Sequence, residues 1–517
     1  MNRSEGEGAE TLTSAVSKYT GTYSVRAHFP GHKGRASTRG RPDTLWERGH
    51  VELDEALDLV QRFDVTEAEG LDNLLYPKAC IKETEEWIAR VFGARRSVIS
   101  TGGATAGVLA AFLAAKMLHP ERSKAALTRG AHRSAISGII LAGLEPVFFY
   151  PEFVPFLGGY LPASAEDVMP VLEEYGPELA CLFLVNPTYY GLCADISQVI
   201  SAAHQEGVPV IVDEAHGSHF PFSRKLPPSA LTAGADIVIH GVHKSLPVLT
   251  QGGLLHVGLE SLVPVELVEE AFRLVATSSP SYILMSSIER GVRIAAETDW
   301  VDSGIRTATK LSSILGRIPD ICVNQDLFLR GELPGQGRCG QARMGSRVEA
   351  VFRWDPGRIS ISACNWRVRG RDMARALMNA GLSPEMAGER DVLLVVTGAD
   401  DESAICRMVE SVREMMSRGL QCCDIRSAGV APRIAQRMPP REAFFSTRKY
   451  VNIDSSAGMV VAETVMIYPP GVPILVPGEE VSVEAIEYIR RCESEGLAVL
   501  GVYQRESEMM LACVDSW

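Results

Sequence analysis

The sequence predicts an α/β protein in which a large domain built on a mostly parallel sheet is followed by a smaller α+β domain. Between residues 95 and 260, short apolar runs recur, and a polar or glycine-rich break and a helical stretch follow them. Runs of this length and of branched or aliphatic content are typical of strands buried on both faces. Their alternation with helices favours a parallel sheet covered by helices. A second alternation begins near residue 358 and predicts the smaller domain.

The individual elements follow from these patterns. The strands expected in the large domain are Ser97–Thr101, Lys124–Thr128, Ala180–Val185, Val208–Val212 and Asp236–His240, and the helices between them are Ala104–Met117, Ser134–Leu141 and Ile196–Gln205. Ser286–Leu315 is expected as one long helix. The second alternation predicts strands at Arg358–Ala363 and Val392–Val396 and helices at Arg371–Ala380 and Asp401–Arg418. We divide the chain into an N-terminal dimer-forming segment (1–75), a major domain (76–310), a linker (311–357) and a C-terminal α+β domain (358–517).

The composition is that of an ordinary globular protein. Of the 517 residues, 46% are hydrophobic and 22% are charged, which argues against disorder. The 51 Lys and Arg residues and 64 Asp and Glu residues give a net charge of −13, so neither nucleic acid nor an anionic membrane is an expected partner. No apolar run reaches the ~18 residues that a membrane span needs. Because the start of the chain is polar and the 11 cysteines are scattered without a C-x-x-C pair, we expect a cytoplasmic protein with reduced thiols.

A glycine-rich segment, Ser100-Thr-Gly-Gly-Ala-Thr105, follows the first expected strand and opens a helix. Glycine lets the backbone approach a ligand closely, and the free amides at the start of a helix attract an anion. The segment therefore suits a phosphate, although it equally suits a glycine-rich turn that begins a helix. It lacks the Lys-Ser/Thr of a P-loop, which disfavours a triphosphate.

An acidic segment, Asp213-Glu-Ala-His216-Gly, follows the fourth expected strand. Ligands of such sheets lie beyond the carboxyl ends of the strands, where Asp213 is expected. A helicase-type acidic box needs a P-loop upstream, which this sequence lacks. A metal site made of Asp213, His216 and His219 has no further cluster to support it, and we expect no metal. The remaining interpretation is a carboxylate that pairs with the ring nitrogen of a cofactor.

A lysine, Lys244, follows the fifth expected strand and lies directly after His243 among apolar residues. A lysine in this position is usually a solvated charge. A partly buried amine, however, shifts toward its neutral, nucleophilic form and can form a Schiff base with a carbonyl compound.

These three elements together fit pyridoxal 5'-phosphate. This cofactor needs a cradle for its phosphate, a lysine for its aldehyde and an acid that keeps its ring nitrogen protonated. Each of the three follows a predicted strand, in the order phosphate segment, Asp213, Lys244. This is the order of the aspartate-aminotransferase-like class of enzymes that use this cofactor, so the sequence predicts pyridoxal phosphate as the cofactor.

Further motifs are spread over most of the chain. They are Phe29–Gly34, Phe63–Glu67, Gly70–Asn73, Pro77–Glu83, Ser100–Thr105, Ala131–Ser134, Asp213–Gly217, His243–Gln251, Thr277–Tyr282, Tyr468–Pro473 and Pro477–Glu479. In this order they resemble the bacterial-type ornithine/lysine/arginine decarboxylases, in their short form without an N-terminal receiver-like domain. The resemblance implies a large domain with the fold of pyridoxal-phosphate-dependent transferases (fold type I). It also implies α-decarboxylation of arginine, lysine or ornithine to a polyamine-pathway amine and CO2.

The resemblance also implies roles for individual residues. Lys244 resembles the lysine that binds the cofactor, and Asp213 resembles the partner of its ring nitrogen. His132 resembles a histidine that stacks on the pyridine ring, although a histidine at such a position is also a common core residue. The resemblance implies a phosphate cradle at Gly103, Ala104 and Thr105, and it places His216 and His243 near the reacting amine. Ser278 and Ser279 resemble a segment that reaches the site of a neighbouring subunit, which implies a homodimer. Glu463 resembles a counter-charge for a basic side chain, although it is equally well explained as a solvent-facing glutamate.

Two departures from the family pattern bear on activity. Family members commonly have Ser-Thr before the His-Lys pair, with the serine as a phosphate ligand, whereas Gly241-Val242 stands there in this chain. One phosphate contact is then absent, or His240 or Ser245 supplies it. Arg133 also replaces the lysine of the family's His-Lys-Ser.

Two other functions are compatible with the sequence. The first is another reaction of the same cofactor, such as transamination or side-chain lysis, because a fold does not determine its chemistry. The second is a catalytically silent regulator that binds polyamines or partner subunits. Gly241-Val242 is the only feature that supports it, and the intact Lys244, Asp213 and His132 oppose it.

Overall fold

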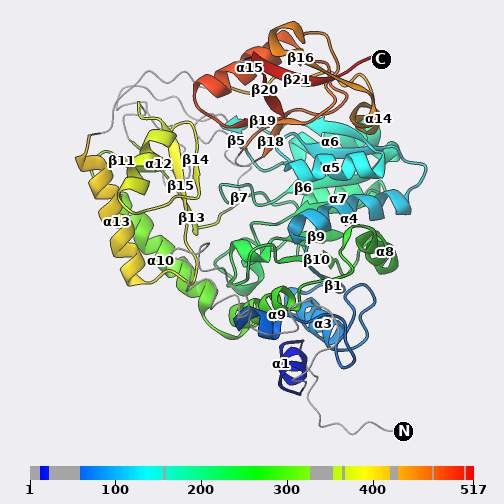
Figure 1. Ribbon diagram of the computed structural model, residues 1–517, viewed down its shortest axis with the longest axis vertical. Helices are drawn as coiled ribbons and strands as arrows, with labels where there is room; N and C mark the ends of the chain where they lie inside the picture. The colour runs from blue at the N-terminus through cyan, green and yellow to red at the C-terminus, as the bar shows by residue number, and fades with distance from the viewer. Residues whose placement is uncertain are drawn as a thin grey trace, which may run out of the picture.

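The computed structural model describes residues 12–22, 59–154, 159–325, 353–363, 367–419, 429–468, 471–505 and 508–516 (Figure 1). Its largest element is a seven-stranded sheet in the order β1-β10-β9-β8-β6-β2-β3. The strands are β1 (Arg96–Ser100), β2 (Lys124–Thr128), β3 (Glu145–Phe149), β6 (Leu179–Val185), β8 (Val210–Asp213), β9 (Ile237–His240) and β10 (Gly253–Val257). All neighbouring pairs from β9 to β3 are parallel, whereas β10 runs antiparallel to both β1 and β9. The predicted α/β class with a mostly parallel sheet is therefore confirmed.

Helices cover both faces of this sheet (Figure 1). Those of the large domain are α3 (Cys80–Phe92), α4 (Gly103–Leu118), α5 (Arg133–Ala142), α6 (Ala165–Tyr175), α7 (Ser197–Gln205), α8 (Val265–Val275) and α9 (Tyr282–Glu297), and α1 (Leu12–Thr22) packs on α3 and α9. Helix α4 consists largely of alanine, glycine and leucine, which lets it pack closely on the strands. A Cβ at Gly107 would lie 3.0 Å from Cγ2 of Ile239 on β9, so a larger residue there would push α4 away.

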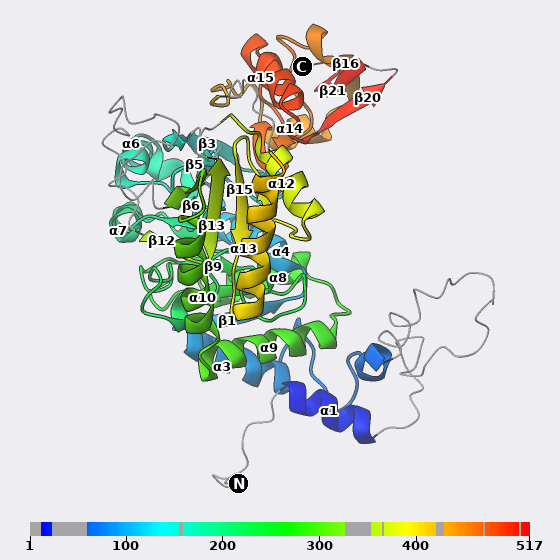
Figure 2. The same cartoon turned by 90° about the vertical axis from the view of Figure 1, so that its left-hand side faces the viewer.

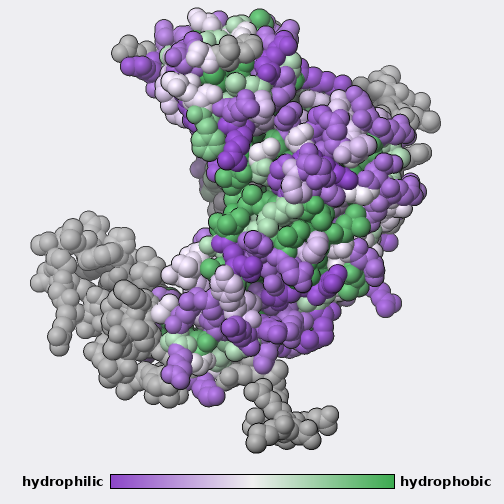
Figure 3. Space-filling model, turned by 90° about the vertical axis from the view of Figure 1, so that its right-hand side faces the viewer, coloured by the Kyte–Doolittle hydropathy of each residue, from purple (hydrophilic) through white to green (hydrophobic). Residues whose placement is uncertain are grey.

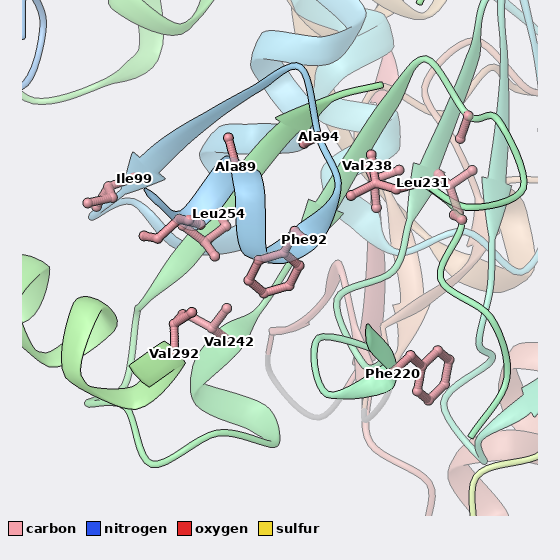
Figure 4. Close-up of a cluster of buried hydrophobic side chains, with 14 of the residues drawn as sticks. Ala89, Phe92, Ala94, Ile99, Phe220, Leu231, Val238, Val242, Leu254 and Val292 are labelled. Atoms are coloured by element: carbon pink, nitrogen blue, oxygen red, sulfur yellow. The ribbon is translucent and has the colours of Figure 1, made fainter. Parts of the chain in front are cut away.

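The apolar core lies between the sheet and these helices. Figure 4 shows one part of it, where Phe92 of α3, Val238 of β9 and Leu254 of β10 point toward one another. Because these strands are buried on both faces, the sequence shows them as continuous apolar runs.

The predicted long helix Ser286–Leu315 is two helices, α9 and α10 (Trp300–Leu315). The prediction was wrong because Thr298 has an extended backbone (φ −130°, ψ 177°). Its hydroxyl donates to the carbonyl of Ile294 at 2.6 Å and accepts from the amide of Trp300 at 3.2 Å. Threonine side chains compete in this way with the helical hydrogen bonds, and the helix ends there.

Helix α10 leads into a second, smaller layer of structure. Its sheet has the order β11-β13-β15-β14, with β11 (Ile321–Val323), β13 (Arg358–Ala363), β14 (Met386–Ala387) and β15 (Asp391–Val395). Figure 2 shows α10 and α13 (Glu402–Ser417) side by side along this sheet, and α12 (Gly370–Asn379) also packs on it. These elements share one apolar core, which includes Leu311, Ile361 and Val412.

The last part of the chain forms a separate core around α15 (Val483–Ser494). Its remaining elements are β16 (Arg448–Asn452), β17 (Val465–Ile467), β18 (Val472–Leu475), β19 (Val499–Leu500), β20 (Val502–Arg505), β21 (Glu508–Val514) and α14 (Pro440–Phe445). These strands form two three-stranded antiparallel sheets, β16-β21-β20 and β18-β17-β19. Two strand pairs lie elsewhere in the chain: β4 (Phe153–Val154) with β5 (Gly159–Tyr160), and β7 (Leu192–Cys193) with β12 (Arg353–Trp354). The domain boundaries that we expected stay predictions.

A buried ion pair joins this last part to the large domain. Arg129, directly after β2, donates to both carboxylate oxygens of Glu479, at 2.6 and 3.0 Å, and to the carbonyl of Ile474 at 2.6 Å. Both charged side chains are 1% exposed. The contact holds β18 against the loop that follows β2.

The described helices include no candidate for a membrane span. Apolar residues nevertheless gather on the surface, across the middle of the face shown in Figure 3. Leu141 of α5 and Leu274 of α8 are 43% and 70% exposed.

Candidate active site

A cavity of 720 Å³ opens at the carboxyl ends of β1, β2, β6, β8 and β9. Parallel strands end at the same edge of a sheet, so residues far apart in the sequence meet there. The predicted site residues that line it are Gly103, Ala104, Thr105, His132, Asp213, His216, His243 and Lys244. Side chains of the β13–β15 sheet and of the last part of the chain close the cavity from the other sides.

Lys244 ends a short 3-10 helix, Val242–Lys244, that directly follows β9. Its Nζ lies 2.8 Å from Nε2 of His216. Burial lowers the pKa of Lys244 below its ordinary value, and the carboxylate of Asp213 opposes this shift. Gly241 leaves room for the lysine, because a Cβ there would lie 3.1 Å from the carbonyl of Ala215 and 3.4 Å from Cδ of Lys244. The amine is thus held inside the cavity and is biased toward its neutral form.

Asp213 is the last residue of β8 and is 8% exposed. Its Oδ1 accepts a hydrogen bond from the amide of Ala215 at 3.1 Å, which fixes the carboxylate at the end of the strand. Since Asp213 and Lys244 line the same cavity, a ligand between them would meet a carboxylate and an amine.

His132 is the residue before the first turn of α5, and its ring caps that helix. Nδ1 accepts from the amide of Ser134 at 3.2 Å and lies 2.9 Å from the hydroxyl of Ser134. Because Nδ1 accepts, Nε2 carries the proton in the neutral ring. Burial lowers the pKa of His132, so the ring is neutral at pH 7. A capped, neutral ring of this kind presents a flat face of fixed orientation to the cavity.

The residues predicted as an anion cradle lie in the first turn of α4. Gly103 has φ +69° and lies beside the carbonyl of Gln251, which a Cβ would approach to 3.5 Å. Gly253, at the start of β10, packs so closely that its Cβ would lie 2.6 Å from the carbonyl carbon of Gly103. The amides of Ala104 and Thr105 belong to the turn whose N–H groups have no partner within the helix. A helix start of this kind binds anions such as phosphate.

His243 is also fixed at the cavity. Its Nδ1 donates to the carbonyl of Gly252 at 2.8 Å, so the lone pair of the neutral ring is on Nε2. A proton acceptor is therefore present next to Lys244 in the sequence and in the same cavity.

Among the side chains of the cavity that were not predicted from the sequence are Arg358, Tyr189 and Glu385. Arg358 of β13 is 3% exposed, and its Nη2 lies 3.2 Å from Nδ1 of His216. Tyr189 lies against the ring of His216, with centroids 4.7 Å apart, and donates from its hydroxyl to Glu385 at 2.5 Å. Nothing in the local sequence marks these residues. Arg358 and Glu385 reach the site only through the packing of the smaller sheet on the large domain, and Tyr189 comes from the segment between β6 and β7.

Several predicted residues lie outside the cavity. Ser278 and Ser279 are exposed in the turn after α8. Glu463 accepts from the hydroxyl of Tyr503 at 2.6 Å and lies 3.9 Å from Arg448. The roles of these residues stay predictions. The motif Phe29–Gly34 lies outside the described residues.

The two candidates for a replacement phosphate ligand also lie elsewhere. His240 is fully buried, with Nε2 2.7 Å from Glu214 and Nδ1 3.1 Å from His256. Ser245 is buried, and its hydroxyl lies 2.7 Å from that of Ser218. Neither lines the cavity, so of the two alternatives for Gly241-Val242 we expect the absence of that contact.

Known proteins resemble this chain along nearly its whole length. Residues 10–315 match the family model for the major domain of Orn/Lys/Arg decarboxylases, and residues 427–501 match the model for their C-terminal domain. An arginine decarboxylase of Bacillus anthracis is 31% identical over 496 residues, which are 95% of this chain and 94% of that protein. An arginine decarboxylase of Bacillus subtilis (strain 168) is 30% identical over 498 residues, 95% of each chain.

Solved structures agree in fold. Lysine decarboxylase A from Pseudomonas aeruginosa superposes with a TM-score of 0.79, covering 98% of this chain and 80% of that chain at 18% identity.

Proposed function

This chain belongs to the Orn/Lys/Arg decarboxylase family of pyridoxal-phosphate-dependent carboxy-lyases, and we propose that its substrate is L-arginine. The family assignment confirms the predicted decarboxylation of a basic amino acid and the predicted cofactor. The identity of that amino acid and the roles of single residues are proposals. The observation that carries the choice of arginine is the full-length similarity to two proteins named arginine decarboxylase.

The residues of the cavity fit pyridoxal phosphate. The start of α4 offers amides for a phosphate, Lys244 offers an amine for an aldehyde, and Asp213 offers a carboxylate for a ring nitrogen. The capped ring of His132 offers a flat surface for an aromatic ring. A volume of 720 Å³ leaves space for an amino acid beside the cofactor.

When bound, the cofactor accepts the electrons of the bond that breaks between Cα and the carboxyl group. In our proposal Asp213 would stabilise positive charge at the ring nitrogen, and Lys244 would hold the aldehyde of the cofactor. After CO2 has left, Cα needs a proton. Lys244 and His243 are the groups that we propose as its source, because both line the cavity and each has a nitrogen that can bind and release a proton.

One wall of the cavity suits a cationic side chain. Glu385 and Glu389 contribute carboxylates, and Tyr189 and Tyr468 contribute aromatic rings. A guanidinium group is planar, donates to carboxylates in pairs and stacks on aromatic rings, so this wall favours arginine over the shorter ornithine.

A decarboxylation assay tests the proposal. The purified protein, with pyridoxal phosphate added, is incubated with carboxyl-labelled arginine, lysine or ornithine, and the labelled CO2 is counted. We expect the highest kcat/KM with arginine. A preference for lysine or ornithine refutes the substrate. Formation of a 2-oxo acid without CO2 favours transamination, and no turnover with any of the three favours a silent homologue.

We also propose that the protein is a homodimer in a reducing cytoplasm. The exposed apolar residues on α5 and α8, together with the exposed Ser278 and Ser279 of the turn after α8, support a contact with a second copy. The seven cysteines of the described residues form no disulfide, which supports a reducing compartment. Light scattering of the purified protein gives the oligomeric state, and a monomeric mass would contradict the dimer.

A further inference from the structure

Three polar side chains form a line across the cavity. His216 lies in the middle, with Nε2 2.8 Å from Nζ of Lys244 and Nδ1 3.2 Å from Nη2 of Arg358. The two outer residues come from different sheets, since Lys244 follows β9 and Arg358 begins β13. Each ring nitrogen of His216 therefore has one hydrogen-bond partner.

The chemistry of the groups decides the direction of both hydrogen bonds. A guanidinium group is permanently charged in proteins and only donates, so Nδ1 of His216 must accept. A neutral imidazole has one lone pair and one N–H group, so Nε2 carries the hydrogen and points it at Lys244. An ammonium group has no lone pair and cannot accept this hydrogen bond, whereas a neutral amine can.

We infer that Arg358 is a positioning residue: by donating to Nδ1 of His216 it makes Nε2 the donor, and this donor holds Lys244 as a neutral amine. The inference rests on the proposed function, because it concerns the amine that binds the cofactor there. It deepens that function by explaining why the amine is ready to attack an aldehyde, which only the neutral form does.

The surroundings hold Arg358 in its place. Its Nε lies 3.8 Å from Oδ2 of Asp355, and that carboxylate also lies 3.1 Å from Nε2 of His219. A Cβ at Gly191 would lie 2.7 Å from Cγ of Arg358, so only glycine at this position leaves room for the arginine. Arg358 is thus fixed by packing on one side and by a carboxylate on the other.

The charges around the line agree with the inference. Burial holds the pKa of His216 well below its ordinary value, and the cation of Arg358 lowers it further, so its ring stays neutral. The pKa of Lys244 is lowered by burial first and by Arg358, against the carboxylates nearby. The titratable and charged groups that act on this line are Asp213, Glu385, Arg358, His132 and His243. The two carboxylates favour an ammonium group, so a neutral Lys244 depends on the groups that oppose them.

Two measurements on the full chain without cofactor test the inference. In the first, ¹⁵N-labelled histidine gives the tautomer of His216 from long-range ¹H–¹⁵N correlations, with the signal assigned by the variant His216→Asn. We expect the Nε2–H tautomer in the unaltered protein. The Nδ1–H tautomer there would overturn the inference, whether or not any variant folds.

In the second measurement, trinitrobenzenesulfonate labels neutral amines, and mass spectrometry of the Lys244 peptide gives the labelling rate against pH. We expect Arg358→Met to move the midpoint up by about one pH unit, which is about tenfold slower labelling near neutral pH. Arg358→Lys keeps a charged donor and should restore most of the rate. Arg353→Met is the matched control, because Arg353 donates to the carbonyl of Leu226 at 3.0 Å, outside the cavity.

The outcomes separate the hydrogen bond from the charge. If Arg358→Met keeps the Nε2–H tautomer while the midpoint moves, the charge alone acts and the inference is wrong. If the pH midpoint of Lys244 labelling is unchanged in Arg358→Met, the inference is also wrong. A protein without decarboxylase activity that shows the expected tautomer and midpoint would refute the proposed function and leave this inference standing.

Discussion

Replacing Arg129 by methionine should loosen the last part of the chain from the large domain. The change removes both hydrogen bonds to Glu479 and leaves its carboxylate 1% exposed without a cation. Breaking one partner of a buried ion pair typically costs about 3–5 kcal/mol. The amide of Val476, which donates to Glu479 at 2.8 Å, is too weak a partner to offset this loss.

Hydrogen exchange measures the effect locally. If the segment from β18 to Glu479 exchanges through local opening, a loss of about 3–5 kcal/mol accelerates exchange on the order of a hundred- to several-thousand-fold. The matched control is Arg437→Met, since Arg437 pairs with the neighbouring Glu480 at 2.6 Å but is 50% exposed. An exposed pair contributes about 0–1 kcal/mol, so the control should exchange less than about fivefold faster.

A double variant separates the effect of an unpaired buried charge from the effect of lost packing. In the double variant Arg129→Met/Glu479→Leu no buried charge is left without a partner. We therefore expect its hydrogen-exchange rate to return most of the way to that of the unaltered protein. Acceleration below about tenfold in Arg129→Met alone would refute the reasoning, because it would mean that the carboxylate finds water or another cation.

Four further outcomes follow from the structure. Lys244→Ala should abolish both CO2 release and the visible absorbance band of the bound cofactor, and turnover in that variant would contradict its proposed role. Glu385→Gln should raise KM for arginine about tenfold or more with a smaller change in kcat, because a hydrogen bond to a charged group contributes about 1.5–3 kcal/mol. An unchanged KM would show that Glu385 does not bind the substrate. Burial raises the pKa of Asp391 from 3.8 to about 7, so this carboxyl group stabilises the fold fully below pH 3.8 and loses that contribution as the pH rises through about 7. The urea midpoint of Asp391→Asn should therefore fall less between about pH 5 and pH 8 than that of the unaltered protein, and equal slopes would contradict the raised pKa. Gly191→Ala places a Cβ 2.7 Å from Cγ of Arg358, at a residue whose φ of +85° favours glycine. The thermal midpoint of this variant should therefore drop. A midpoint equal to that of the unaltered protein would show that Arg358 can move aside.

The sequence predicted the sheet and the residues at its edge well. The strand Lys124–Thr128 was predicted with the bounds that it has in the structure, and Arg358–Ala363 likewise. Strands buried on both faces are visible in the sequence as apolar runs. Because parallel strands end together, the polar residues that follow these runs could be placed in one site from the sequence alone.

Contacts between distant parts of the chain could not be predicted in this way. Arg358 and Glu385 reach the cavity from the smaller sheet, and their place depends on how that sheet packs on the large domain. The break between α9 and α10 depends on the conformation of one residue, Thr298, whose sequence context is compatible with a continuous helix. Two of the seven strands, β3 and β10, were not predicted at all, and an apolar run would not have shown that β10 is antiparallel to its neighbours.

The reversed direction of β10 has a consequence for the loop that carries Lys244. Since β9 and β10 are antiparallel neighbours, residues 241–252 form a hairpin connection, and His240 and Leu254 at its two ends are directly paired. Both ends of this connection are anchored in neighbouring strands inside the sheet, since neither β9 nor β10 is an edge strand. Inserting or deleting a residue in the hairpin would shift the amine relative to Asp213, so the length of this short loop is as much a requirement of the site as the lysine itself.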